Sequence, residues 1–361
     1  MANLFDYLAW RGDLPFSVSP FNEVDNLILS MLSFINYTDI VPTGILGTPV
    51  KLSKCHEIKK DRGISSESFG KIIPKATYDL FVAAAESKRF SDVFVTYYKE
   101  ETRIRETKQF AAVTFILPDN SLFVAYRGTD DSIVGWREDF NLSFTSQTMS
   151  QKAALDYLTN IASVYRGKIR TGGHSKGGNH AVYAAVFAPK DVRDRIITAY
   201  SNDGPGFVSE IINSTEFSEM ESKIYTIVPQ SSIIGMLLEH KENYSVIESS
   251  EKGGLFQHNP FSWSVLGTSF VHLDSLSEKG KRHDEVISGW LSKISPSERQ
   301  IFTETLFNVI EATGAKTVTE LTTDQFSKLT TAIKAYNSLG KETKEKMYTF
   351  VKRLLSAIRQ Q

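Results

Sequence analysis

One serine lies in a sequence context that can make its hydroxyl a nucleophile. Residues 173–177 read Gly-His-Ser-Lys-Gly, after a strand-length segment at 167–171 and before a helix-length run of small and apolar residues. A G-x-S-x-G pattern between a strand and a helix is typical of a nucleophile elbow. Its glycines let strand and helix pack closely, and the helix N-terminus directs free N–H groups at an oxyanion. We therefore expect Ser175 to be a nucleophile; the alternative is a glycine-rich packing loop.

A nucleophilic serine needs a base and an acid, and both candidates follow Ser175 in the chain. Arg195–Asn202 reads as a strand, and Asp203 comes directly after it. In a doubly wound sheet, functional groups collect beyond the carboxyl ends of the strands, so Asp203 is the candidate acid. Its alternative role is that of an Asx-type turn residue.

His258 is the candidate base among four late histidines. It follows the strand predicted at Tyr244–Glu248, where the chain can return over the nucleophile and keep the order serine, acid, histidine. The other three have structural explanations: a helix cap for His240, a place near a strand for His272, and a charged helical turn for His283.

A predicted antiparallel hairpin leads to a further loop of interest. Two apolar runs, QFAAVTFIL and SLFVAYRG, are joined by the turn-forming residues 118–120. The second strand, Leu122–Arg127, delivers Gly128 and Thr129 to one end of the sheet. From this placement alone, Thr129 could be no more than a turn residue.

Two segments resemble a known family. The segment AYRGTDDSIVGWREDF is similar to the RGT and W-x-x-D region of class 3 lipases, and GGHSKGGNHAVYAA is similar to their GHSLGG elbow. The opening residues 3–29, together with GHSKGGN, more closely resemble a bacterial family of uncharacterised lipase-like α/β-hydrolases called Mbeg1-like. The resemblance covers most of residues 1–290.

The resemblance implies an α/β-hydrolase fold of the class 3 lipase type and a serine hydrolase that cleaves a carboxylic ester, lipid-like or of short acyl chain. It also implies an oxyanion hole formed by the N–H and often the hydroxyl of Thr129, and by the N–H of Lys176. Trp136 and Asp139 are expected to be structural. Class 3 lipases usually carry their acid after the strand that corresponds to 223–228, where this chain has Gln230, Ser231 and Ser232.

That departure keeps other functions open. A thioesterase or an amidase would use the same three residues, because the elbow does not distinguish leaving groups. A hydrolase-fold protein with a decayed triad, acting as a binding module, is the alternative from a different class.

Composition limits the partners. The chain has 361 residues, 41% of them hydrophobic, and a formal net charge of -1, which is typical of a soluble globular protein without a field that recruits nucleic acid. The single cysteine, Cys55, excludes an intramolecular disulfide and a Cys-rich zinc site. We expect no cofactor and no metal. With neither a secretion signal nor a membrane span in view, a cytoplasmic location is expected.

Three regions are predicted. Residues 1–75 form an N-terminal helical elaboration, with an amphipathic helix at Pro20–Tyr37 and a surface excursion from 38 to 74. Residues 76–290 form the hydrolase core, in which Ile233–Leu238 is either a core helix or part of a lid. Residues 291–361 form a helical bundle that packs on the core or makes a homodimer. A basic face at Lys352–Arg353 offers peripheral membrane contact.

Overall fold

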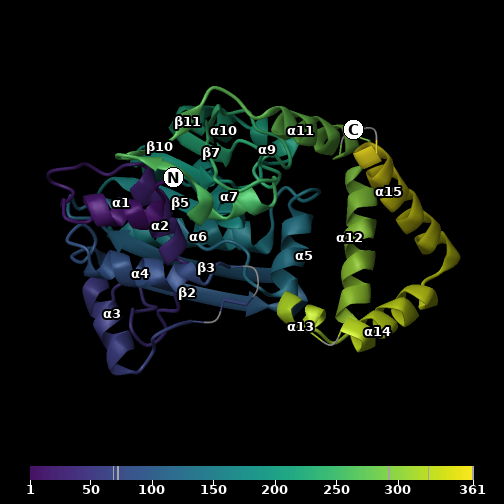
Figure 1. The fold of residues 1–361 in the computed structure, drawn as a ribbon, viewed down its shortest axis with the longest axis horizontal. Helices are drawn as coiled ribbons and strands as arrows, with labels where there is room; N and C mark the ends of the chain where they lie inside the picture. The colour runs from purple at the N-terminus through teal and green to yellow at the C-terminus, as the bar shows by residue number, and fades with distance from the viewer. Residues whose placement is uncertain (68, 71–72, 292, 324, 360–361) are drawn as a thin grey trace.

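A mixed β-sheet is the centre of the molecule (Figure 1). The computed structural model describes residues 1–67, 69–70, 73–291, 293–323 and 325–359, without the side chains of 287–288, 290, 325–327, 351 and 353–359. Within these residues, nine strands form one sheet in the order β1-β2-β3-β4-β5-β6-β7-β8-β11. They are β1 (Val50–Lys51), β2 (Phe94–Arg103), β3 (Lys108–Ile116), β4 (Leu122–Tyr126), β5 (Ile169–His174), β6 (Ile196–Asn202), β7 (Ile224–Pro229), β8 (Tyr244–Ile247) and β11 (His272–Leu273), while β9 (Val265–Leu266) and β10 (Ser269–Phe270) pair separately.

Strands β4 to β8 run parallel, and their carboxyl ends lie in register. Tyr126 at the end of β4 pairs with Gly173 of β5, and His174 pairs with Asn202 at the end of β6. The hairpin of β3 and β4 is antiparallel, as predicted, and pairs Ile116 with Leu122. The loops after β4 to β8 therefore leave the same edge of the sheet, where ligand sites of such sheets form.

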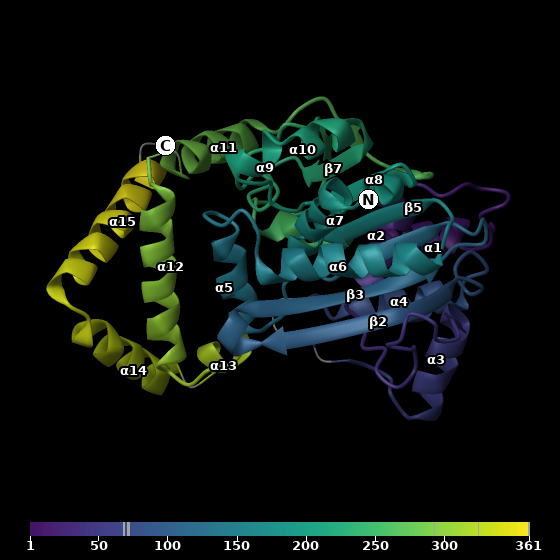
Figure 2. The ribbon, with the colours of Figure 1, turned by 180° about the vertical axis from the view of Figure 1, so that it is seen from behind.

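Helices cover both faces of the sheet (Figures 1 and 2). One face packs against α1 (Leu4–Arg11), α2 (Glu23–Leu32) and α4 (Ala76–Glu86), and the other against α6 (Met149–Val164), α7 (Lys176–Phe187) and α10 (Thr215–Met220). The remaining helices are α3 (Leu52–Asp61), α5 (Ile133–Asn141), α8 (Lys190–Arg193), α9 (Ser209–Ile212), α11 (Glu278–Leu291), α12 (Pro296–Glu311), α13 (Val318–Thr322), α14 (Gln325–Ser338) and α15 (Lys341–Arg359).

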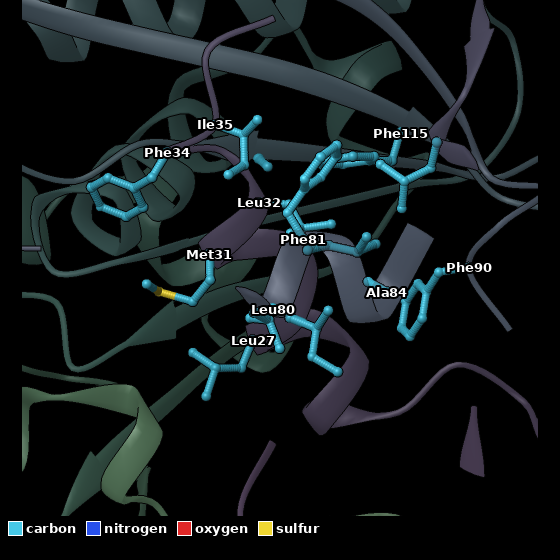
Figure 3. Close-up of a cluster of buried hydrophobic side chains, with 14 of the residues drawn as sticks. Leu27, Met31, Leu32, Phe34, Ile35, Leu80, Phe81, Ala84, Phe90 and Phe115 are labelled. Carbon is cyan, nitrogen blue, oxygen red and sulfur yellow. The ribbon is translucent and has the colours of Figure 1, made fainter. Parts of the chain in front are cut away.

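A helix is present where the sequence predicts one, but α2 is shorter than Pro20–Tyr37 and all ten of its residues are buried, so it has no exposed polar face. It begins at the N-cap Asn22. The Asn22 side chain accepts hydrogen bonds from backbone N–H groups of the first turn, and the Asp25 carboxylate accepts one from the backbone N–H of Asn22, which makes a capping box. Figure 3 shows Leu27 and Leu32 of this helix beside Leu80 and Phe81 of α4, within one buried cluster.

A buried ion pair between Asp25 of α2 and Arg89 links this helix to the segment that precedes it in the chain. Arg89 binds both carboxylate oxygens of Asp25, at 2.7 and 2.5 Å, and the Tyr7 hydroxyl donates to the same carboxylate at 2.7 Å. Both charged side chains are fully buried. The Arg89 guanidinium also donates to the backbone carbonyls of Leu14, Ser19 and Pro20.

The predicted surface excursion contains a helix, α3, which the sequence reading missed. Most residues of this helix are polar, and only Leu52, Cys55 and Lys59 are buried. Burial raises the pKa of the Cys55 thiol to about 12, which keeps it protonated and unreactive at neutral pH. His56 packs edge-on against Phe81 instead of forming a catalytic pair with Cys55.

The segment 233–238 is not a helix, so the core-helix alternative was wrong, and its place in a lid stays a prediction. The segment consists of turns and bends, and Leu238 has a left-handed backbone with φ of 67°. The backbone N–H of Gly235 donates to the Ser232 hydroxyl, 3.0 Å away, instead of to a helical carbonyl. Met236 alone of this segment joins a small buried cluster, with Val228, Val246 and Leu276.

The C-terminal helices meet the rest of the chain at α5, which lies between the sheet and α12 (Figures 1 and 2). The N–H of Ile133 donates to Lys316, and the N–H of Val318 donates to Asp131. Phe307 and Ala315 form a separate buried cluster with Ile133, and Trp136 packs against it. Helix α12 begins with a capping box formed by Ser295 and Glu298.

The outer part of this region consists of α14 and α15, which lie beyond α12 from the sheet (Figure 1). Phe302 of α12 stacks on Phe350 of α15, with ring centroids 3.7 Å apart. The Arg353 side chain lies outside the described residues. In the part of the chain that the structure describes, none of the helices has the length and apolar character that crossing a bilayer requires.

The Arg89–Asp25 pair predicts a large loss of stability on substitution. Arg89→Met leaves a buried carboxylate and three carbonyls without their cation, so the free energy of unfolding should fall by about 3–5 kcal/mol. Lys190→Met, which breaks an exposed pair with Asp194, should cost less than about 0.5 kcal/mol. Urea denaturation of both variants measures the difference, and a loss below about 1 kcal/mol for Arg89→Met would contradict the expectation.

Candidate active site

Ser175 lies on a sharp turn between β5 and α7. Its backbone has φ of 59° and ψ of -134°, a conformation that is strained for any residue other than glycine. A Cβ at Gly173 would come within 2.2 Å of the backbone of Gly177, and a Cβ at Gly177 within 2.1 Å of the Tyr126 carbonyl. The predicted reason for the two glycines is therefore confirmed, and the side chain of Ser175 occupies the N-terminus of α7.

Asp203 follows β6 and faces His258. Its carboxylate is fully buried, and Oδ2 lies 2.6 Å from Nδ1 of His258. Oδ1 accepts a hydrogen bond of 2.5 Å from the Ser232 hydroxyl. Asp203 also has a left-handed backbone, with φ of 51°, and its N–H donates to the carbonyl of Ile227. The structure thus brings together the two side chains that the sequence suggested as acid and base.

Ser232 occupies the position after β7 at which the class 3 pattern usually has its acid, and its contact shows how an acid at another position can be used. Its hydroxyl donates to Asp203 after the neighbouring strand β6. Because β6 and β7 are adjacent and parallel, their carboxyl ends lie side by side. An acid at either end can therefore face the same imidazole. Sequence reasoning did not foresee this contact of Ser232.

The short helical turn Phe256–His258 is fixed from three sides. The Gln257 side chain accepts from the N–H of Ser231 at 2.8 Å, and the Gln257 carbonyl accepts from the indole N–H of Trp263 at 2.8 Å. The carbonyl of His258 lies 2.8 Å from Nε2 of His174. With Nδ1 directed at the Asp203 carboxylate, Nε2 of His258 is the nitrogen that can accept a proton.

His174, the residue before Ser175, is a second contact that the sequence did not reveal. Its ring centroid is 4.4 Å from that of His258. Burial lowers the pKa of His174 well below its usual value, so the ring is neutral. Because its Nε2 faces a carbonyl, we assign the ring proton to Nε2, which donates to His258. His174, the residue before Ser175, therefore anchors the loop that carries His258.

A buried amide pair holds the ends of β5 and β6 against α2. Asn202, directly before Asp203, donates to the carbonyl of Gly173 at 3.0 Å. Its side-chain carbonyl accepts from Asn26 of α2 at 2.7 Å, and its amide donates back to Asn26 at 3.2 Å. These bonds join the segments that carry Ser175 and Asp203.

The loop of Thr129 lies against the elbow. A Cβ at Gly128 would be 2.5 Å from the carbonyl of His174 and 3.3 Å from Cβ of Ser175. The Thr129 hydroxyl lies 2.8 and 2.6 Å from the two carboxylate oxygens of Asp139. A hydroxyl has one proton, and an ionised carboxylate only accepts, so that proton is directed at Asp139. The implied use of the hydroxyl as an oxyanion donor therefore does not fit an ionised Asp139.

Asp139 was expected to be structural, and its carboxylate accepts a hydrogen bond from the Thr129 hydroxyl and lies near the Lys176 ammonium. Partial burial raises the pKa of Asp139 to about 6, an effect that the Lys176 ammonium opposes. The Lys176 ammonium is buried 3.6 Å from this carboxylate. Trp136, the other residue of that motif, packs against the C-terminal helices.

Apolar side chains border His258 on its N-terminal side. Leu255 and Phe256 are 61% and 68% exposed, although both are large and apolar. They follow Gly253, whose φ is 106°, and Gly254, which lies close to Ile233 of the neighbouring loop. Among the described residues, no group of three or more His, Cys, Asp or Glu could hold a metal ion.

The parallel strands with an elbow serine between β5 and α7 have the architecture of a lipase-like α/β-hydrolase. The chain belongs to the Mbeg1-like family, whose model matches residues 84–308. Comparison with curated proteins gave no match.

Solved lipase structures are similar to this chain at low identity. M37 lipase is 17% identical, with 60% of this chain and 70% of that chain covered and a TM-score of 0.36. The Rhizomucor miehei lipase propeptide complex is 14% identical, with 67% and 92% covered and a TM-score of 0.34. A triacylglycerol lipase from Penicillium expansum is 10% identical, with 51% and 75% covered and a TM-score of 0.31.

The raised pKa of Asp139 predicts a pH-dependent contribution to stability. The pKa is about 6 in the folded protein against 3.8 for the unperturbed group, so the folded state binds the proton more tightly between these values. Lowering the pH from 7 to 4.5 should therefore stabilise the wild type by about 2 kcal/mol relative to Asp139→Asn, which cannot titrate. Denaturant unfolding of both proteins at the two pH values measures this difference, and parallel pH profiles would contradict it.

Proposed function

We propose that the chain is a serine hydrolase that cleaves a carboxylic ester through an acyl-enzyme on Ser175. The observation that carries the proposal is the buried Asp203 carboxylate 2.6 Å from Nδ1 of His258, whose loop is hydrogen bonded to His174, the residue before Ser175, which has φ of 59°. Strained backbone persists where the surrounding structure holds it, and such positions cluster at functional sites.

The three residues have distinct roles in the proposed reaction. Ser175 Oγ attacks the acyl carbon while Nε2 of His258 takes its proton. The proton then passes to the leaving alcohol, and the ester bond breaks to leave the acyl group on Ser175. Asp203 holds the imidazole with Nδ1–H toward itself and stabilises the imidazolium. Water then attacks the acyl-enzyme by the same route, which releases the acid and restores the serine.

Backbone N–H groups would stabilise the oxyanion. We assign the two donors to Thr129, whose loop lies against the elbow, and to Lys176, the first residue of α7. An N–H at the start of a helix has no intrahelical partner, and the helix dipole favours negative charge there. Removing one such donor typically slows acyl transfer about 10²- to 10³-fold.

The exposed Leu255 and Phe256 support a substrate with an apolar acyl chain. Large apolar side chains beside a reactive centre can cover an acyl chain, and each buried CH₂ contributes about 0.8 kcal/mol. The segment 249–256, with Gly253 and Gly254, is the proposed hinge for movement over the site. The Asp203–His258 contact argues against a decayed triad, because it keeps an acid and a base in the arrangement that a triad uses.

Labelling with a fluorophosphonate probe tests this function. The wild type should label, Ser175→Ala should not, and His258→Ala and Asp203→Asn should label about 10²- to 10⁴-fold more slowly because the serine loses its base or the base loses its orientation. His272→Ala is the matched control, since His272 binds Glu23 elsewhere on the sheet and should leave the rate unchanged. A folded wild type that stays unlabelled, with detergent present to open a closed site, would rule out the proposal.

Ester series of graded length test the acyl-chain assignment. Phe256→Ser should lower kcat/KM for octanoyl and longer esters by about tenfold, and should change acetyl ester hydrolysis little, because only the long chain reaches this side chain. Leu266→Ser is the control, since Leu266 is 70% exposed on β9 and does not border His258. An equal loss for short and long esters would contradict the assignment.

A further inference from the structure

Lys176, the residue after the candidate nucleophile Ser175, is a buried cation. Only 1% of its side chain is exposed. Its ammonium donates to the side-chain carbonyl of Gln109 at 2.7 Å and lies 3.4 Å from the carboxylate of Glu138 and 3.6 Å from that of Asp139. A charge so far from water is stable only with partners of opposite sign.

The two carboxylates around Lys176 have different second partners. Glu138 is fully buried and accepts backbone N–H bonds from Gln109 at 3.0 Å and Ser150 at 2.8 Å. Asp139, in contrast, accepts a hydrogen bond from the hydroxyl of Thr129. Glu138 therefore holds backbone in place, whereas Asp139 holds the loop that carries a proposed oxyanion donor.

We propose that Lys176 is a positioning residue for the proposed hydrolysis, acting through Asp139 on Thr129. Its charge keeps Asp139 ionised, so the Thr129 hydroxyl donates in one fixed direction and the Thr129 N–H stays aimed at the oxyanion. This inference rests on the proposed function. It gives the side chain of Lys176 a role separate from that of its own backbone N–H.

The chemistry of the carboxyl group explains why its ionisation matters. An ionised carboxylate only accepts hydrogen bonds, whereas a protonated one both donates and accepts. Thr129 facing a neutral Asp139 could thus donate or accept, and its loop would lose its single arrangement. Burial already raises the pKa of Asp139 to about 6, and Lys176 is the first opposing influence. Without the ammonium, the pKa of this carboxyl would rise further toward neutral pH.

The other charged groups near Asp139 do not replace Lys176. Glu138, the adjacent residue on α5, raises the pKa of Asp139 further. His180, one turn along α7 from Lys176, is fully buried, and burial with the nearby Lys176 lowers its pKa well below the usual value, so it is neutral. Arg137 pairs with Glu311 of α12.

A double-mutant cycle tests the inference. Fluorophosphonate labelling rates are measured at pH 7 for the wild type, Lys176→Met, Asp139→Asn and the double variant. Lys176→Met should label about 10- to 100-fold more slowly, less than the 10²- to 10³-fold loss of a whole oxyanion donor. If Lys176 acts through Asp139, the double variant should be within about threefold of Asp139→Asn. Additive losses, or a folded Lys176→Met with the wild-type rate, would overturn it.

A matched variant separates the general effect of losing a buried lysine from the specific effect of losing Lys176 at the site. Lys59 of α3 is 2% exposed and pairs with Glu67, and α3 lies at one end of the molecule, well away from α5 (Figures 1 and 2). Lys59→Met should lower the melting temperature and leave the labelling rate unchanged. If it slows labelling as much as Lys176→Met, the effect is general destabilisation and the inference is wrong. Lys176→Gln, which keeps a donor for Gln109 without the charge, is used if Lys176→Met does not fold.

Carboxyl carbon NMR gives a readout that needs no hydrolysis. With the Asp139 signal assigned by its loss in Asp139→Asn, its titration midpoint should be about 6 in the wild type and higher in the Lys176 variants. An unchanged midpoint would overturn the inference. If the wild type does not react with the probe, the proposed hydrolysis fails, and this titration alone still shows whether Lys176 sets the charge of Asp139.

Discussion

The close packing of β5, α7 and β4 is the constraint on which the candidate site depends. Gly173, Gly177 and Gly128 have no room for a Cβ, because neighbouring backbone lies within 2.5 Å of each such position. The chain can leave β5 and enter α7 in so little space only by turning sharply at Ser175. A left-handed non-glycine residue costs about 1–3 kcal/mol, which the surrounding packing must offset. The Ser175 side chain is thereby placed at the helix N-terminus.

The same edge of the sheet brings the other residues to Ser175. Thr129, Asp203, Ser232 and His258 all follow parallel strands that end at this edge, and each belongs to a different loop. Because the parallel register fixes the ends of β6 and β7 side by side, the acid can lie after β6 with a serine after β7 bonded to it. Position in the sheet, and not the identity of one loop, decides which carboxylate can orient the imidazole.

The C-terminal helices contact the segment between Thr129 and α5, which carries part of the candidate site. The N–H of Ile133 and the carbonyl of Asp131, just after Thr129, hydrogen bond to residues 316–318. Helix α5 also carries Glu138 and Asp139, the two carboxylates around Lys176. The region beyond residue 291 thus packs directly on the segment that contains the proposed oxyanion loop.

Local patterns in the sequence were enough to predict the elbow, the hairpin, the place of Asp203 at a strand end and that of His258 in the loop after β8. Each of these depends on residues within about ten positions of one another. The roles of Asp139 and Ser232 depend on contacts between separate loops, which no local pattern contains. Helix α3 was missed because only Leu52, Cys55 and Lys59 are buried, and one of these is a lysine. The segment 233–238 is apolar enough for a helix, yet Leu238 is left-handed.

The most direct test of the account is a crystal structure of the protein after reaction with a phosphonate inhibitor. The account predicts phosphorus bonded to Oγ of Ser175, with the phosphoryl oxygen about 3 Å from the backbone nitrogens of both Thr129 and Lys176. Nε2 of His258 should lie within hydrogen-bond distance of the remaining ester oxygen or of Oγ. An adduct on any other residue, or a phosphoryl oxygen directed away from these two N–H groups, would contradict it.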